Sequence, residues 1–272
     1  MIEFETSDSP NVVIRLDRIN SKSRKILLFL NAIVESSIES RRNSPRSTWV
    51  TRESVYEHLR EGYNYQDFQP WGESFTECST LPSINLVDHR DYFLGGYQID
   101  RPLRLPNSFE ELFNIYFQLD KLLQNKFTRA AYWFNLAHGQ KSASARFLHL
   151  IQCIETLMPG AESTEVCTHC NREIGKGPTK RFQEFLDELV PAKPELVKKR
   201  KQLYKLRSDL THGWDLFARD LREATMTPKS SDQMLQTLDA YQLARFALVN
   251  WLSRQARQSQ QSLESNTVVP LA

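Results

Sequence analysis

The chain has 272 residues, of which 40% are hydrophobic and 25% are charged, ordinary values for a globular protein with a sizeable core. A formal net charge of +2 is too small for bulk electrostatics to favour nucleic-acid binding, so any RNA site must be a local basic patch. The four cysteines are too few and too unevenly spaced for a secreted disulfide scaffold. The start is acidic and has no signal-peptide pattern, and no apolar run approaches a membrane span. We therefore expect a cytoplasmic protein with no membrane segment.

The predicted elements begin with an N-terminal region, residues 1–106, of mixed and irregular structure that we interpret as regulatory. Residues 11–19 alternate in polarity and predict a short strand. Residues 21–40 predict a helix because apolar side chains recur on one stripe. A shorter helix is predicted over residues 52–61. The stretch 63–106 is rich in proline and aromatic residues, which favours an ordered loop with a short strand.

Residues 107–262 predict one helix after another, and residues 263–272 predict a flexible tail. Before a long final helix, the expected helices span residues 108–125, 128–138, 142–158, 179–190 and 194–212. We expect capping boxes to open the first and the final helix, formed by Ser108 with Glu111 and by Ser230 with Gln233. The predicted fold class is mainly α, a helical bundle with a less regular N-terminal region.

The helix predicted over residues 194–212 ends in an Arg-x4-His pair, Arg207 and His212, directly before Gly213. An imidazole transfers protons near neutral pH, and a guanidinium stabilises the charge that builds up on a phosphate in the transition state. The two side chains can therefore serve RNA cleavage without a metal ion. We interpret them as candidate catalytic residues, with Ser208 and Asp209 as candidate supporting residues.

The surroundings of the pair favour this interpretation. Arg207 falls on the same helical stripe as Leu203 and Leu210, where a charge is costly unless it meets a partner. Glu155, on the helix predicted over residues 142–158, is a candidate for that partner and a further supporting residue. Basic side chains on the same helix as Arg207 are suited to phosphates, and the candidates for RNA binding are Lys199, Lys201 and Lys205.

A purely structural interpretation explains the same residues. Arg207 could form an ordinary salt bridge, His212 could cap the helix, and the lysines could be a solvated helix face. A second Arg–His pair, Arg52 and His58, indicates that such spacings also arise by chance. Positions five apart lie about 140° apart on an ideal helix. The two candidate side chains therefore converge only if the helix breaks at His212 or if a second protomer completes the site.

The sequence around the motif resembles a known family. Residues 203–213, Leu-Tyr-Lys-Leu-Arg-Ser-Asp-Leu-Thr-His-Gly, resemble the signature helix of HEPN domains, especially the Apea-like group. The resemblance covers about residues 108–252. It rests on further stretches that agree in the same order, namely residues 127–134, 146–157, 167–170 and 177–182. It implies an α-helical bundle of HEPN type that dimerises and brings two Arg–His motifs into one cleft.

Members of this superfamily are commonly metal-independent endoribonucleases of toxin–antitoxin, phage-defence and abortive-infection systems. The resemblance therefore implies an RNA substrate, a homodimer, no cofactor for catalysis, and an antitoxin or trigger protein as partner. Arg207 would steady the scissile phosphate, and His212 would act on the 2′-hydroxyl or the leaving oxygen. Many members carry Asn, Asp or His directly after the arginine, whereas this chain has Ser208 and then Asp209. Other members are catalytically silent and serve as protein- or nucleotide-binding or dimerisation modules.

An insert at residues 160–178 contains Cys167-x2-Cys170, which supplies half of a tetrahedral zinc site. Cys78, Cys153 or His138 could complete a structural zinc site, or a partner protomer could contribute a second pair. The alternative is a vestigial zinc knuckle or two free thiols. A third hypothesis for the function is therefore a zinc-supported helical adaptor with no RNA role, beside the ribonuclease and the non-catalytic HEPN module.

Overall fold

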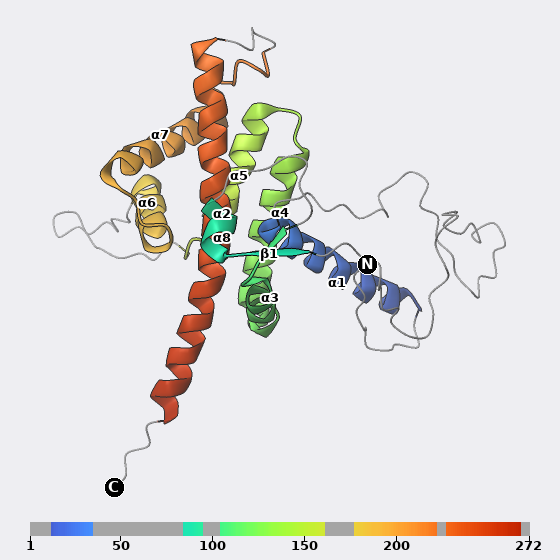
Figure 1. The fold of residues 1–272 in the computed structure, drawn as a ribbon. Coiled ribbons are helices and arrows are strands. Elements are labelled where there is room, and N and C mark those ends of the chain that lie inside the picture. Colours follow the sequence, from blue (N-terminus) through green and yellow to red (C-terminus); the bar gives the residue numbers. More distant parts are fainter. Residues whose placement is uncertain (1–11, 35–83, 95–103, 161–176, 222–226, 268–272) are drawn as a thin grey trace, which may run out of the picture.

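The computed structural model describes residues 12–34, 84–94, 104–160, 177–221 and 227–267. This part of the chain is built mainly of helices, so the predicted mainly α fold is confirmed (Figure 1). In chain order its elements are α1 (Val12–Ile33), β1 (Asn85–Val87), α2 (His89–Leu94), β2 (Arg104–Pro106), α3 (Phe109–Gln118), α4 (Lys121–Gly139), α5 (Ala143–Leu157), α6 (Pro178–Leu189), α7 (Pro194–Thr211) and α8 (Pro228–Thr267).

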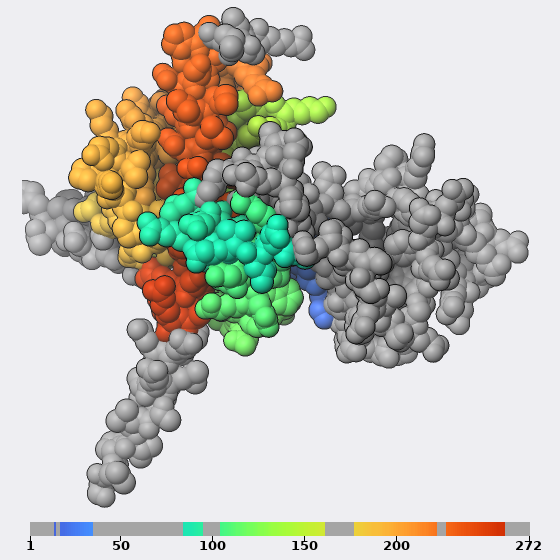
Figure 2. Space-filling model, in the orientation of Figure 1, coloured from blue at the N-terminus to red at the C-terminus, as the bar shows by residue number. Residues whose placement is uncertain are grey.

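The helices α4, α5 and α8 form the centre of the bundle. α5 packs against both α4 and α8, while α1 packs against α4 and α8 on one flank. α6 and α7 pack against each other on the opposite flank of α8 (Figure 1). The two short strands pair in parallel, with Asn85 opposite Arg104 and Val87 opposite Pro106. The space-filling view shows α7 and the N-terminal half of α8 next to each other at the surface (Figure 2).

Aromatic side chains fill much of the core between these helices. The ring of Phe29 on α1 stacks on Tyr116 of α3 at 5.2 Å between centroids, and Phe127 of α4 stacks on Trp251 of α8 at 6.2 Å. Because Phe29 precedes residue 106, the described part of the predicted N-terminal region shares one hydrophobic core with the helices that follow it. Burial of such rings is a large stabilising contribution in any small domain.

The N-terminal predictions need one clear correction. The strand predicted over residues 11–19 is wrong, because α1 is already helical from Val12 and continues to Ile33. Residues 35–83 lie outside the described residues, and so do the end of the helix predicted over 21–40 and the helix predicted over 52–61. The short strand expected within 63–106 is present as part of the pair β1–β2.

The helix predicted over residues 108–125 is in fact interrupted. α3 ends at Gln118, and Asp120 caps α4 by accepting hydrogen bonds from the N–H groups of Leu122 and Leu123 at 2.8 and 2.9 Å. The capping box at Ser108 is also wrong, since the Ser108 side chain makes no cap hydrogen bond. Its hydroxyl instead lies 2.5 Å from Nδ1 of His89 and so joins α3 to α2.

The final helix begins two residues earlier than the predicted capping box. Thr227 and Ser230 form the reciprocal pair: each side-chain oxygen accepts from the other's backbone N–H, at 3.2 and 3.1 Å. Gln233 is buried and accepts from the N–H of Ala218 instead. α8 stays helical to Thr267, so part of the predicted tail 263–272 is helix. Within the described ranges, no helix combines the length and apolar character required to cross a bilayer.

Candidate active site on helix α7

The end of α7 is fixed by a hydrogen-bonding pattern known as a Schellman motif. The N–H of Trp214 donates to the carbonyl of Asp209 at 2.9 Å, and the N–H of Gly213 donates to that of Leu210 at 3.2 Å. The pattern requires a left-handed residue after the cap, and Gly213 supplies it with φ of 73°. His212 is thereby held as the C-cap residue, as the sequence predicts.

The imidazole of His212 projects from this helix end to the surface. Its ring lies against the indole of Trp214, with 5.0 Å between centroids and 30° between planes. Trp214 is itself 76% exposed, whereas Trp251 is core. An exposed imidazole beside an exposed aromatic ring is accessible to a large substrate such as RNA.

Arg207 lies further back on α7 and meets the predicted partner. Its Nη2 lies 3.0 Å from Oε2 of Glu155 on α5, and the two side chains are 32% and 22% exposed. The guanidinium also lies over the ring of Tyr204, 5.7 Å from its centroid. Because one nitrogen is engaged and the side chain stays partly exposed, the remaining N–H groups of Arg207 can bind an anion.

Tyr204 is the member of this cluster that sequence reasoning missed. Its hydroxyl donates to the other carboxylate oxygen of Glu155 at 2.9 Å, so one glutamate holds both the tyrosine and the arginine. Burial and the neighbouring Glu155 carboxylate raise the pKa of Tyr204 to about 12. The signal available in the sequence was spacing alone, because Tyr204 precedes Arg207 by three residues and so shares its helix face.

The supporting residues Ser208 and Asp209 act through their backbone in this chain. The carbonyl of Ser208 accepts from the N–H of His212 at 3.0 Å, and that of Asp209 accepts from Trp214. Neither side chain forms a hydrogen bond within the described ranges, and both are half-buried. Their observed role is therefore to shape the end of α7.

The candidate RNA-binding lysines Lys199, Lys201 and Lys205 are all exposed on α7. Lys199 lies 3.7 Å from a carboxylate oxygen of Asp239 on α8, a surface ion pair of small energetic weight. Arg200, in the middle of this basic run, does not belong to the exposed face. It is 3% exposed, pairs with Asp187 at 3.0 Å and donates to the carbonyl of Val190, so it joins α7 to α6.

The structure therefore brings Arg207, Glu155 and Tyr204 together but does not bring His212 into that cluster. No hydrogen bond joins His212 to Arg207, and the helix remains hydrogen-bonded through His212. α7 ends at Thr211 and the chain turns at Gly213, after His212, so no turn lies between the two residues. A joined Arg–His site across two protomers stays a prediction.

The predicted cysteine site falls in residues 161–176, so Cys167 and Cys170 lie outside the described residues. Cys153, one candidate to complete that site, is fully buried in the core of α5. Burial raises the pKa of its thiol, which disfavours the thiolate that zinc requires. The described ranges contain no cluster of three potential metal ligands.

Replacing Glu155 by glutamine is expected to lower the pKa of Tyr204 toward the value near 10 of a free tyrosine, because the carboxylate charge disappears. Burial opposes a complete return. Spectrophotometric titration of the tyrosines, with Tyr204→Phe to assign the late-titrating group, measures the shift. The matched control is Glu188→Gln, which breaks a peripheral ion pair with Arg254 on α8. An unchanged titration in the Glu155 variant would contradict the hydrogen-bonded cluster.

Comparisons of the chain with models of protein families, with curated proteins and with solved structures found no match.

Proposed function

We propose that the protein is a metal-independent endoribonuclease of HEPN type. The observation that carries the proposal is α7 itself, which presents an exposed His212 at its end and a partly exposed Arg207 with unused N–H donors. In the proposed reaction, a 2′-hydroxyl of RNA attacks the adjacent phosphorus and the 5′-oxygen leaves. The products are a 2′,3′-cyclic phosphate and a 5′-hydroxyl end. His212 moves the proton of the attacking or the leaving oxygen, and Arg207 binds the charged phosphate oxygens.

The neighbouring groups support this assignment of roles. Glu155 and the ring of Tyr204 hold the guanidinium in place, which limits the entropy that Arg207 would lose on binding a phosphate. The exposed lysines on the same helix add positive charge along the path of an RNA strand. Trp214 offers a flat ring beside His212 on which an unpaired base can stack.

We further propose that the active unit is a homodimer, because His212 and Arg207 do not meet in one protomer. Three apolar side chains lie exposed on one side of α8, namely Met234 (66%), Leu235 (58%) and Leu238 (49%). The loop after the motif is fixed to the same part of α8, through Lys229 with Asp215 at 3.5 Å and through Gln233 with Ala218. A second copy seated on this apolar surface would bring its own α7 close to the first.

The biological setting follows from the HEPN resemblance alone. We propose a role in phage defence, abortive infection or a toxin system, with an antitoxin or trigger protein as partner. No cofactor is proposed for the reaction. A structural zinc ion on Cys167 and Cys170 is proposed separately, and the nuclease reaction does not depend on it.

The direct test is cleavage of a mixed RNA pool by the purified protein in EDTA. We expect wild-type protein to leave 2′,3′-cyclic phosphate ends, and Arg207→Ala to lose about two orders of magnitude or more in rate. The matched control is His58→Ala, which alters the second Arg–His pair of the sequence and should retain cleavage. Cleavage that requires an added divalent ion, or that survives in Arg207→Ala, would contradict the proposed mechanism.

Mixing two inactive variants tests the shared cleft. If Arg207 of one protomer acts with His212 of the other, an Arg207→Ala and His212→Ala mixture contains heterodimers with one intact site. Random exchange should then restore roughly a quarter of the wild-type activity. Failure to restore any activity in a mixture that demonstrably exchanges subunits would place both residues of each site in one protomer.

The second candidate function is a non-catalytic HEPN module that binds a partner protein or a nucleotide through the same surface. The observation that favours it is the ion pair between Arg207 and Glu155, which partly neutralises the charge that a phosphate would meet. The two functions differ in one result. The module would bind its partner with no cleavage by wild-type protein, even with its dimer intact.

A further inference from the structure

A second arginine, Arg181 on α6, lies at the same end of α5 as the cluster around Arg207. Its Nη2 donates to the carbonyl of Pro159 at 2.8 Å, in a hydrogen bond that is exposed to solvent. Pro159 comes just after the end of α5 and four residues after Glu155. Because four residues make about one helical turn, Arg181 is anchored close to the carboxylate that holds Arg207.

The packing of α6 on α7 supports the same placement (Figure 1). Phe182, next to Arg181 in the sequence, lies against the ring of Tyr204, with 4.6 Å between centroids. Burial and the Glu155 carboxylate raise the pKa of Tyr204. The positive charges of Arg207 and Arg181 lower that pKa, so both guanidinium groups act on one tyrosine hydroxyl.

Arg181 keeps more of its charge for a ligand than Arg207 does. The carboxylate of Glu155 partly neutralises Arg207, whereas Arg181 bonds a neutral carbonyl and forms no ion pair within the described ranges. Only one of its N–H groups is used in that bond, so most of its donors remain available for a phosphate. Two guanidinium groups beside one carboxylate leave a net positive charge, which favours an anionic ligand.

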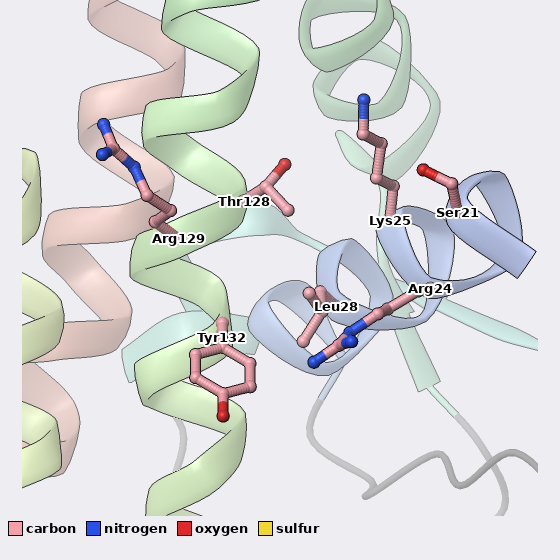
Figure 3. A pocket seen from close by; sticks show the side chains of 7 residues that line it. All are labelled: Ser21, Arg24, Lys25, Leu28, Thr128, Arg129 and Tyr132. Carbon is pink, nitrogen blue, oxygen red and sulfur yellow. The ribbon is translucent and has the colours of Figure 1, made fainter.

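The basic side chains between α1 and α4 are arranged differently. Arg24, Lys25 and Arg129 line a hollow there whose exposed lining is mostly apolar. Their charged ends point to different sides of the hollow and do not meet at one position (Figure 3). Arg181 and Arg207 are instead fixed by bonds to neighbouring residues at one end of α5.

We propose that Arg181 binds a phosphate of the RNA strand next to the one that Arg207 binds. This inference rests on the proposed ribonuclease function, and it adds a substrate contact on α6 to the site on α7. A single strand carries one phosphate per nucleotide, so an RNA whose reacting phosphate lies at Arg207 presents its next phosphate to a neighbouring helix. Arg181 takes that phosphate and fixes the register of the strand, while Arg207 acts on the reacting one.

Binding of a fluorescent 2′-O-methyl oligoribonucleotide to the full chain tests the proposal, because this probe lacks the attacking 2′-hydroxyl and cannot be cleaved. Fluorescence anisotropy over a range of salt concentrations gives the affinity and its salt dependence. We expect Arg181→Gln to weaken binding by about tenfold, the usual effect of losing a charge-assisted hydrogen bond. The slope of log K against log salt concentration should become shallower by about 0.7, the value for one lost phosphate contact on a single strand. Arg181→Lys keeps the charge and should keep the slope.

The alternative is that Arg181 only stabilises the end of α5 through its bond to Pro159. The matched control is Arg146→Gln, because Nη2 of Arg146 donates to the carbonyl of Gln140 at the same 2.8 Å, near the opposite end of α5. Both changes should lower the thermal midpoint by a few degrees at most. Only Arg181→Gln should change the RNA affinity and the salt slope. In cleavage assays it should raise KM by about tenfold and change kcat less than about twofold, as expected when ground-state and transition-state binding weaken equally.

The outcomes separate this proposal from the nuclease assignment. If wild-type protein binds the oligonucleotide with an Arg181-dependent slope but leaves unmodified RNA intact, the nuclease assignment fails and the phosphate contact stands. If wild-type protein cleaves RNA and Arg181→Gln binds and cleaves as well as it does, the phosphate contact fails alone. The proposal is also overturned if wild-type protein does not bind the oligonucleotide, or if Arg146→Gln loses as much affinity and slope as Arg181→Gln.

Discussion

Replacing His212 by alanine is expected to reduce RNA cleavage by about two to four orders of magnitude, the usual contribution of a general acid or base. The thermal midpoint should stay nearly unchanged. The ring of His212 contacts the exposed Trp214, and the hydrogen bonds that end α7 at this position come from the backbone. Alanine preserves those bonds, so the change removes chemistry and almost no packing. Cleavage in EDTA and a thermal melt on the same preparation measure the two quantities.

A second histidine provides the opposite behaviour as a control. His89 bonds the hydroxyl of Ser108 at 2.5 Å, and its ring packs on Phe93 at 4.8 Å. His89→Ala should therefore lower the free energy of unfolding by about 1–2 kcal/mol while each folded molecule still cleaves RNA. A large fall in the melting temperature of His212→Ala, with activity lost only in proportion to unfolding, would support the structural interpretation of the motif instead.

Both ends of α7 could be predicted from the sequence because the residues that determine them are local. Gly213 permits the left-handed conformation, Pro194 suits the first turn, and the intervening residues need only their neighbours in the chain. The pairing of Glu155 with Arg207 was also predictable, since a charge on an apolar stripe requires a partner. In both cases one physical requirement, a left-handed residue or a partner for a charge, decides the structure and no second residue of the described ranges meets it instead.

The predictions at three helix starts failed because a residue other than the expected one takes part in the hydrogen bonds there. Ser108 has the spacing of a capping box, but its hydroxyl is taken by His89. Ser230 is not the N-cap of the final helix. Thr227 is the N-cap, and Ser230 is the residue three positions later that completes the capping box. Similarly, α3 ends at Gln118 and Asp120 caps the start of α4 inside a continuous apolar pattern. Only His89, the partner of Ser108, becomes visible when the structure brings two elements together; Thr227 and Asp120 are local signals that the predictions passed over.

The division of the basic residues on α7 is a matter of tertiary structure. Arg200 and its neighbour Lys201 have the same charge in the sequence, yet Arg200 is buried against Asp187 and Lys201 is exposed. Which of them turns inward depends on where α6 packs against α7. The same packing places Tyr204 over Phe182, with 4.6 Å between ring centroids, and aims its hydroxyl at Glu155.

Replacing Asp220 by alanine is expected to give the largest loss of stability from one surface carboxylate, about 2 kcal/mol. Asp220 lies in the segment that follows the Arg–His motif, and its side chain contacts the first turn of α5. Its oxygens accept from the N–H groups of Ala143 and Ser144, both at 2.8 Å, and from the hydroxyl of Ser142 at 3.0 Å. Those two N–H groups belong to the first turn of α5 and have no partner inside the helix. Urea unfolding at neutral pH measures the change.

The stability that the Asp220 carboxylate contributes should decrease as the pH falls. Burial alone would raise the pKa of Asp220, but the hydrogen bonds from Ser144, Ala143 and Ser142 outweigh it and hold the pKa below its ordinary value. A carboxyl whose folded pKa is lowered stabilises the fold above its unfolded pKa, near 3.9, and loses that contribution as pH falls through the folded value. The difference between wild type and Asp220→Asn should therefore be full at pH 7 and shrink below about pH 4. Asparagine keeps the shape of the side chain, so a difference that stays constant over this range would mean that the charge of Asp220 does not hold the loop to α5.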